Sequence, residues 1–257
     1  MEKIKDALRS PNVRLIGLHG LSGVGKTTLV KEIARETLQS SEAAKVFDVV
    51  AMSNVTRNPD IRKIQGQIAD MLGMTLDEES DIARAARIRR RLKNEKESTL
   101  IILDDLWGAV DFNMLGIPLE SSDDDGEHSM IIKMKETSSA NVKEGKIPGE
   151  HSKNNINMIE SKKLPRASSS VKTEETLGHY KGCKVLLISE IKQVLLSQMN
   201  GKENYIYFVE VLKEKEAEIF FKKMAGVGDG KSEFDKLATQ IANKCNGLPM
   251  SIVTTAR

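Results

Sequence analysis

The sequence feature that most constrains the fold is a glycine-rich turn between an apolar run and an amphipathic stretch. Residues 13–18, VRLIGL, are typical of a buried β-strand, and apolar side chains recur at helical spacing over residues 29–38. Between them, HGLSGVGKTT at 19–28 matches the pattern GxxxxGK[S/T]. Glycine lets the backbone turn tightly enough to direct successive N–H groups at phosphate oxygens. The order strand, loop, helix therefore predicts a phosphate-binding loop.

Two side chains of this loop carry the predicted chemistry. We expect Lys26 to reach the terminal phosphates of a nucleotide as a compact charge, and the Thr27 hydroxyl to ligate Mg²⁺. The helix that begins near Lys26 adds the positive end of its dipole. The residues of this loop expected to bind the nucleotide are Gly20, Gly23, Val24, Gly25, Lys26, Thr27 and Thr28.

A second motif, IILDD at 101–105, ends a run typical of a strand buried on both faces. Asp104 is placed to hold Mg²⁺, and Asp105 to orient or deprotonate an attacking water. An Asp pair also suits a turn or a helix N-cap. The phosphate-binding loop upstream favours the metal role.

Strand patterns alternate with helix patterns along most of the chain. Further strands are predicted at 45–53 and 184–189, the latter followed by a helix to about Met199. Asn58 and Pro59 suit the N-cap and first position of a helix that Gly73 ends, and Ser80 suits the N-cap of a helix with Ile82 on its apolar stripe. The fold class is therefore α/β, a parallel sheet flanked by helices.

The pattern changes twice along the chain. Residues 129–179 lack apolar periodicity, so we expect a largely disordered insertion there. From Lys213 onward only helix patterns occur, with Ser232 as a weak cap, Gly247 as a stop and Pro249 in a following first turn. We expect a nucleotide-binding domain over 1–204 and a partial helical subdomain over 205–257.

Composition excludes several classes of function. Lys plus Arg is 39 and Asp plus Glu is 37, so the net charge of +2 predicts no general attraction to nucleic acid or membrane surfaces. The basic run RIRRRLK at 87–93 lacks aromatic neighbours and favours a solvated helix face. Cys183 and Cys245 have no metal-ligand spacing. Without a signal-peptide or membrane-span pattern, we expect a cytoplasmic protein.

Several segments together resemble a known family. GLHGLSGVGKTTL, TLIILDDLWG, GCKVLLIS and CNGLPMSIV occur in the order and spacing of a plant disease-resistance nucleotide-binding domain. The chain resembles the NB-ARC domain of the coiled-coil NLR class, a STAND-type P-loop ATPase. The segments at 46–74 and 208–226 resemble the same family.

This resemblance implies an ADP/ATP switch in plant immunity, in which ADP holds the domain inactive and ATP opens it. It assigns the phosphate site to the loop residues above, Mg²⁺ to Thr27 and Asp104, and hydrolysis to Asp105. It places Pro249 near the adenine and residues 11–13 on the other side of the base. It also implies protein partners that bind through coiled-coil and leucine-rich-repeat regions.

The chain departs from the family pattern in three places. The family has an arginine that senses the terminal phosphate where this chain has Glu190, a carboxylate that repels phosphate, and Lys192 suits the next helix better than that role. Residues 129–179 look added, either as a functional loop or as retained intron sequence. From the resemblance we also expect a truncated domain, since the sequence reaches Arg257 before the family's winged-helix and repeat regions and shows no N-terminal coiled-coil pattern.

Three functions remain open at this point. The first is a switch that binds ADP and hydrolyses ATP slowly, if at all. The second is an active P-loop ATPase or kinase, favoured by the complete set of Lys26, Thr27, Asp104 and Asp105. The third is a truncated adaptor or pseudogene product without nucleotide-dependent function.

Overall fold

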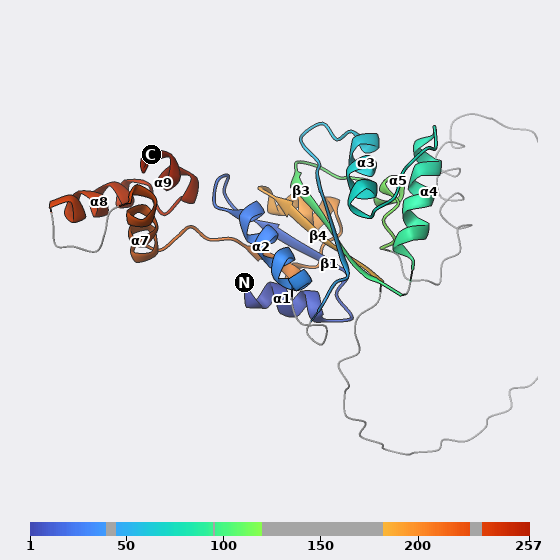
Figure 1. Ribbon diagram of the computed structural model, residues 1–257, viewed down its shortest axis with the longest axis horizontal. Coiled ribbons are helices and arrows are strands. Elements are labelled where there is room, and N and C mark those ends of the chain that lie inside the picture. The colour runs from blue at the N-terminus through green and yellow to red at the C-terminus, as the bar shows by residue number, and fades with distance from the viewer. Residues whose placement is uncertain (40–44, 95, 120–181, 227–232) are drawn as a thin grey trace, which may run out of the picture. The chain divides into compact units, whose positions relative to one another are not determined.

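A five-stranded parallel sheet forms the centre of the computed structural model, which describes residues 1–39, 45–94, 96–119, 182–226 and 233–257. Its strand order is β2-β3-β4-β1-β5, and every pairing is parallel. Figure 1 shows the neighbouring strands β3, β4 and β1 between helices. The strands are β1 Leu15–His19, β2 Val49–Asn54, β3 Ser98–Leu106, β4 Gly182–Ser189 and β5 Ile206–Phe208. The predicted α/β fold is confirmed.

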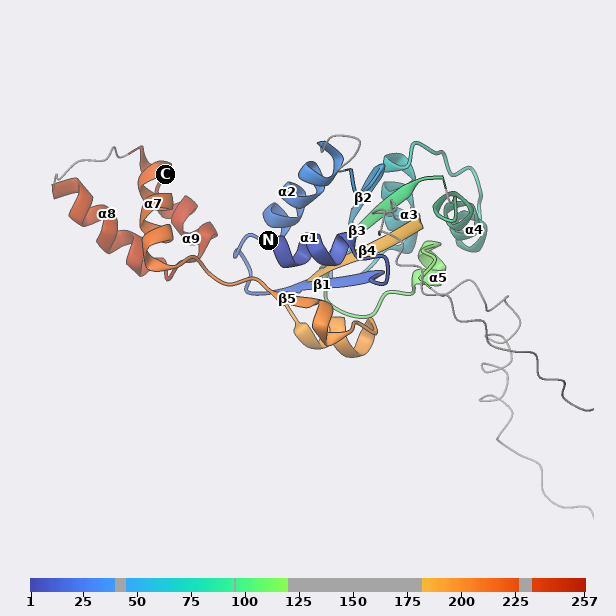
Figure 2. The same cartoon turned by 90° about the horizontal axis from the view of Figure 1, so that it is seen from below.

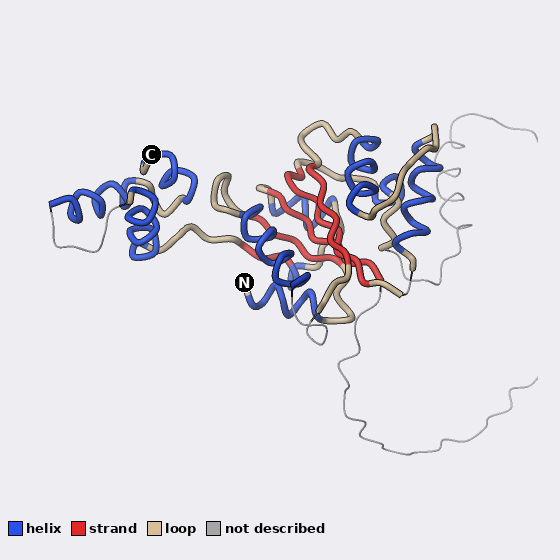
Figure 3. The backbone as a smooth tube through the Cα atoms, in the orientation of Figure 1, coloured by secondary structure: helices blue, strands red, loops and turns tan. Residues whose placement is uncertain are grey.

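Helices cover both faces of the sheet (Figure 3). On β3, Leu100 and Ile102 face α1 Glu2–Arg9 and α2 Lys26–Gln39, whereas the alternate residues Ile101 and Leu103 face the other helices. Burial on both faces explains the continuous apolar sequence of this strand. The second face carries α3 Ile61–Met71, α4 Asp81–Leu92, α5 Phe112–Leu115 and the π-helical turn Val194–Gln198.

Two of the predicted helix details are wrong. Helix α3 is capped by Asp60, whose carboxylate accepts a hydrogen bond from the Lys63 N–H at 3.0 Å, and not by Asn58. Proline favours an extended conformation in the residue before it, so Asn58 and Pro59 belong to the approach to the helix. On α4, Ile82 is exposed and the buried face begins at Arg84. The caps expected at Ser80 and Gly73 are present.

Helix α1 and strand β5 are among the elements that were not predicted from the sequence. Helix α1 precedes the first strand, and β5 adds a short parallel strand beside β1 (Figure 2). After β5, the Val209 N–H donates to the His19 carbonyl at 2.8 Å, so the sheet pairing continues past the boundary expected at 204/205. We propose that the domain boundary lies after Val209.

Three helices follow this point, α7 Glu214–Ala225, α8 Glu233–Lys244 and α9 Pro249–Thr255. They share an apolar cluster that includes Ala217, Phe221, Ala242 and Ile252. Pro249 occupies the first turn of α9, as expected. The insertion at 129–179 and the cap at Ser232 lie outside the described residues.

A buried lysine on the central strand β4 contacts the segment between α1 and β1. Lys184 on β4 is fully buried, and its ammonium donates to the Ser10 carbonyl just after α1. Burial, and then the positive charge of Arg14, lower the pKa of Lys184 from 10.5 to about 8. The protein therefore holds this ammonium group at an energetic cost.

This cost makes stability depend on pH. Between pH 8 and 10.5 the unfolded chain binds more protons at Lys184 than the folded chain, so its contribution to stability becomes more favourable as pH rises through that window. The free energy of unfolding of wild type minus that of Lys184→Met should increase by up to about 3 kcal/mol from pH 7.5 to 10.5. Urea unfolding at both pH values measures this difference. Lys202→Met, at an exposed lysine, is the control, and an equal response in both variants would contradict the prediction.

Candidate functional site

The glycine-rich loop connects β1 to α2 at the carboxyl end of the sheet. Gly23 and Gly25 have φ angles of 72° and 95°, a region that L-residues with a Cβ rarely adopt. A Cβ on Gly23 would also lie 2.7 Å from the Cβ of Met250 on α9. The Met250 N–H donates to the Gly23 carbonyl at 3.2 Å. Gly23 is therefore required both by the turn and by the close approach of α9.

Lys26, the first residue of α2, folds back over the loop. Its ammonium donates to the carbonyls of Gly20 at 2.8 Å and Leu21 at 2.9 Å. These bonds place a positive charge beside the loop, at the N-terminus of a 14-residue helix. The arrangement suits an anion.

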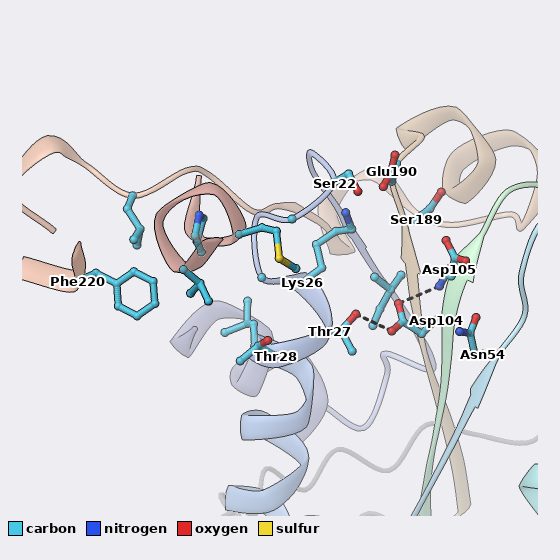
Figure 4. Close-up of a pocket in the computed structure, with 18 of the residues that line it drawn as sticks. Ser22, Lys26, Thr27, Thr28, Asn54, Asp104, Asp105, Ser189, Glu190 and Phe220 are labelled. Carbon is cyan, nitrogen blue, oxygen red and sulfur yellow. Dashed lines mark hydrogen bonds between the residues drawn. The ribbon is translucent and has the colours of Figure 1, made fainter. Parts of the chain in front are cut away.

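Thr27 meets Asp104 across the sheet. The Thr27 hydroxyl donates to Oδ2 of Asp104 at 2.6 Å, and the backbone N–H of Asp105 donates to Oδ1 at 2.8 Å (Figure 4). Asp104 is 8% exposed. A hydroxyl and a carboxylate in contact form the hard oxygen donor set that Mg²⁺ takes together with phosphate and water. Among the described residues no group of three or more His, Cys, Asp or Glu forms a metal site, so a cation here would depend on such additional ligands.

Asp105 has an unusual backbone. Its φ is 60°, and the register of β3 with β4 breaks between Leu103 and Leu106. Asp is among the few residues that enter this left-handed region. Its carboxylate accepts a hydrogen bond from the indole Nε1 of Trp107 at 2.8 Å.

A pocket of about 860 Å³ joins these groups to the C-terminal helices. Its polar lining includes Lys26, Thr27 and both aspartates (Figure 4). Its apolar lining comes from α2, β4, α7, α9 and the segment before α7. The volume lies in the range of small-ligand sites. The lining residues are Ser22, Gly23, Gly25, Lys26, Thr27, Thr28, Leu29, Asn54, Asp104, Asp105, Ile188, Ser189, Glu190, Leu212, Glu216, Phe220, Pro249, Met250 and Val253.

Most sequence-predicted site residues meet in this pocket. Gly20 and Val24 are exceptions: neither lines it, although the Gly20 carbonyl holds Lys26. Val13, expected beside the base, is buried in the core against α1 and α2 and does not line the pocket. Sequence reasoning missed the apolar residues Leu29, Phe220 and Met250, and also Asn54. Asn54 had a usable signal, because it ends β2 at the edge where parallel strands present their carboxyl ends.

The charge of the lining is unbalanced. Among the described lining residues Lys26 is the one cation, against the carboxylates of Asp104, Asp105, Glu190 and Glu216. Lys192 offers no local compensation for Glu190, since its ammonium pairs with Glu203 at 2.8 Å. The nearby His19 ring lies tilted against the Phe208 ring with the centroids 5.1 Å apart, and burial, with Lys192 and Lys26, lowers the pKa of His19. The histidine therefore favours its neutral form and adds no positive charge at neutral pH.

Comparison with known families decides what this site belongs to. A family model described as the NB-ARC domain matches residues 1–155. The chain belongs to the NB-ARC family. The predicted family is thereby confirmed, whereas the coiled-coil subclass stays a prediction.

Curated relatives of this NB-ARC chain are plant proteins. It is 30% identical over 255 residues to "Disease resistance protein At4g27190" of Arabidopsis thaliana, covering 99% of this chain and 20% of that protein. It is 28% identical over 257 residues to "Probable disease resistance protein At4g27220" of the same plant, covering 100% of this chain and 21% of that protein. The chain thus spans about a fifth of the length of these relatives.

Solved structures share the fold of the NB-ARC chain. Cdc6p from Pyrobaculum aerophilum matches with a TM-score of 0.53 at 12% identity, covering 99% of this chain and 56% of that one. The Aeropyrum pernix ORC2 protein, solved as ADPNP–ADP complexes, matches with a TM-score of 0.54 at 16% identity, covering 99% and 60%. In the described part of the chain, none of the helices is both long and apolar enough to cross a membrane.

The two roles of Gly23 can be separated by substitution. Gly23→Ala should lower the free energy of unfolding by more than the about 1–2 kcal/mol expected for φ > 0 alone, because the new methyl group meets Met250. Gly73→Ala is the matched control, since Gly73 has a φ of 66° and no atom within 4 Å of an added Cβ. Urea unfolding gives both costs. Equal costs would refute the close approach of α9 to the loop.

Proposed function

We propose that this NB-ARC domain binds ADP and ATP with Mg²⁺ and acts as the nucleotide switch of a plant disease-resistance protein. The observation that carries the proposal is the contact of the Thr27 hydroxyl with Asp104 at 2.6 Å, beside Lys26 in the pocket lining. The loop supplies N–H groups and a helix terminus for phosphates, and these residues supply a lysine and two oxygen ligands.

The pocket offers the nucleotide two kinds of surface, one polar for the phosphates and one apolar for the base. Gly23, Gly25, Lys26, Thr27 and Thr28 would hold the phosphates. The base would lie against the apolar part of the lining, which includes Pro249, Leu29, Phe220 and Met250. Mg²⁺, when bound through Thr27 and Asp104, supplies positive charge that offsets the phosphates and the excess of carboxylates.

We infer that the site favours the diphosphate and hydrolyses ATP slowly. Glu190 lines the pocket at the end of β4, directly after Ser189. A carboxylate there repels an added negative phosphate, and no arginine is present among the described lining residues to offset it. Asp105 is the residue we propose to orient the attacking water.

The surrounding protein is also a proposal. The named relatives are resistance proteins about five times as long as this chain. We propose that the domain works inside a longer cytoplasmic protein whose other regions contact protein partners.

Nucleotide titration of the purified chain tests the proposal. ADP with Mg²⁺ should bind and raise the melting temperature, and Lys26→Ala should weaken binding at least about tenfold by removing the pocket's cation. EDTA should weaken binding to wild type more than to Thr27→Ala. Fast steady-state turnover, above about 1 s⁻¹, would instead indicate an active ATPase. The absence of nucleotide binding by wild type would indicate an adaptor.

The preference for ADP has its own test. Glu190→Arg should raise the affinity for ATP about tenfold and that for ADP much less, because it replaces a repelling carboxylate with a guanidinium. Glu210→Arg makes the same charge change at an exposed residue outside the pocket and is the control. Calorimetric Kd values for both nucleotides decide the matter; a uniform gain for both variants would assign the effect to net charge alone.

A further inference from the structure

The pocket has a supporting layer that the proposed function does not use. Trp107 lies two residues after Asp105, outside the pocket lining, and its indole N–H donates to Oδ1 of Asp105 at 2.8 Å. The guanidinium carbon of Arg57 lies 4.5 Å from the centre of the Trp107 ring, in the geometry of a cation–π contact. The side chains of Asp105 at the end of β3, Trp107 directly after it and Arg57 after β2 are therefore connected in series.

The backbone around these residues is tied to the same strand. The Val55 N–H donates to the Asp104 carbonyl at 2.8 Å, so the segment that carries Arg57 is attached to β3 beside the aspartates. Thr56, which lies between Val55 and Arg57 in the sequence, has a φ of 63°. Asp105 itself has a φ of 60°. Both segments hold conformations that non-glycine residues rarely adopt, and such conformations persist only where surrounding contacts maintain them.

The bond from the indole restricts the Asp105 carboxylate. A strand-end aspartate rotates about two torsions, and one donor bond to Oδ1 selects a narrow range of these rotations. Oδ2 receives no hydrogen bond from the described residues, so it remains available to accept from another donor. Asp105 is one of the residues that line the pocket.

We propose that Trp107, held in place by Arg57, is a positioning residue that orients the Asp105 carboxylate toward the water that hydrolyses ATP. The inference rests on the proposed function. In this step the water oxygen bonds to the γ-phosphorus while the bond from that phosphorus to the β–γ bridging oxygen breaks. The water proton passes to Oδ2 of Asp105, and ADP and inorganic phosphate are the products.

The deciding variant is Trp107→Phe, which keeps an aromatic ring beneath Arg57 but removes the N–H donor. If Trp107 only packs, this variant behaves as wild type. If it positions Asp105, conversion of bound ATP to ADP falls at least about tenfold. The Kd for ADP and for ATP should stay within about twofold, because Trp107 does not line the pocket.

Arg57→Ala tests the outer contact, with Arg90→Ala, at an exposed arginine of α4, as the matched control. Trp107 is the only tryptophan of the chain, so its emission reports this site directly. Arg57→Ala should increase the quenching of that emission by acrylamide and slow hydrolysis, and Arg90→Ala should change neither.

The experiment is single-turnover hydrolysis of radiolabelled ATP with excess protein and Mg²⁺, alongside calorimetric binding on the same samples. Slower conversion by Trp107→Phe at unchanged Kd supports the inference. Equal rates for Trp107→Phe and wild type, or no conversion by wild type that binds ATP, would overturn it while leaving the proposed nucleotide binding intact. If the wild-type protein binds no nucleotide, the proposed function itself is overturned, and this inference with it.

Discussion

The hydrogen bond between Thr27 and Asp104 is the contact on which the site depends. It joins residues 77 positions apart, one at the start of α2 and the other near the end of β3. The two elements meet because parallel strands end at the same edge of the sheet, and β4 alone separates β1 from β3. Lys26 and Asp105 are direct sequence neighbours of this pair. The strand order thus brings Lys26, Thr27, Asp104 and Asp105 to the same edge of the sheet.

Local sequence was sufficient for the glycine-rich loop and for the two aspartates of the site. The spacing of Gly25, Lys26 and Thr27 after a strand, and of Asp104 after four apolar residues, fixes where these groups lie in any sheet of this kind. The apolar half could not be derived in this way. Phe220 and Met250 line the pocket only because helices from a later segment pack near the loop, and no local pattern encodes that arrangement. The short β5 was missed for a similar reason, since three residues carry too little periodicity.

The two wrong helix predictions have the same cause, which is that a sequence pattern does not show the hydrogen bonds that a side chain makes in the fold. Asn58 with Pro59 and Asp60 both satisfy the sequence rule for a helix start, and the side-chain bond to Lys63 decides between them. Ile82 fits an apolar stripe by spacing, yet Arg84 occupies the buried side, where its guanidinium donates to Gln65 at 3.0 Å and to the Leu76 carbonyl at 3.1 Å. Because these hydrogen bonds satisfy the guanidinium, Arg84 can occupy a buried position where the sequence pattern predicts an apolar residue. Periodicity alone does not show such partners.

The contact between the loop and α9 has a thermodynamic consequence. Gly23 bonds to Met250 through its carbonyl and leaves no room for a side chain between them. A ligand that reshapes the loop and a protein that draws α9 away would therefore act on one shared contact. Coupling free energies are reciprocal, so the factor by which the ligand would change the affinity for a partner at α9 equals the factor by which that partner would change the affinity for the ligand. A ligand at the loop and a partner at α9 would then influence each other through the contact between Gly23 and Met250.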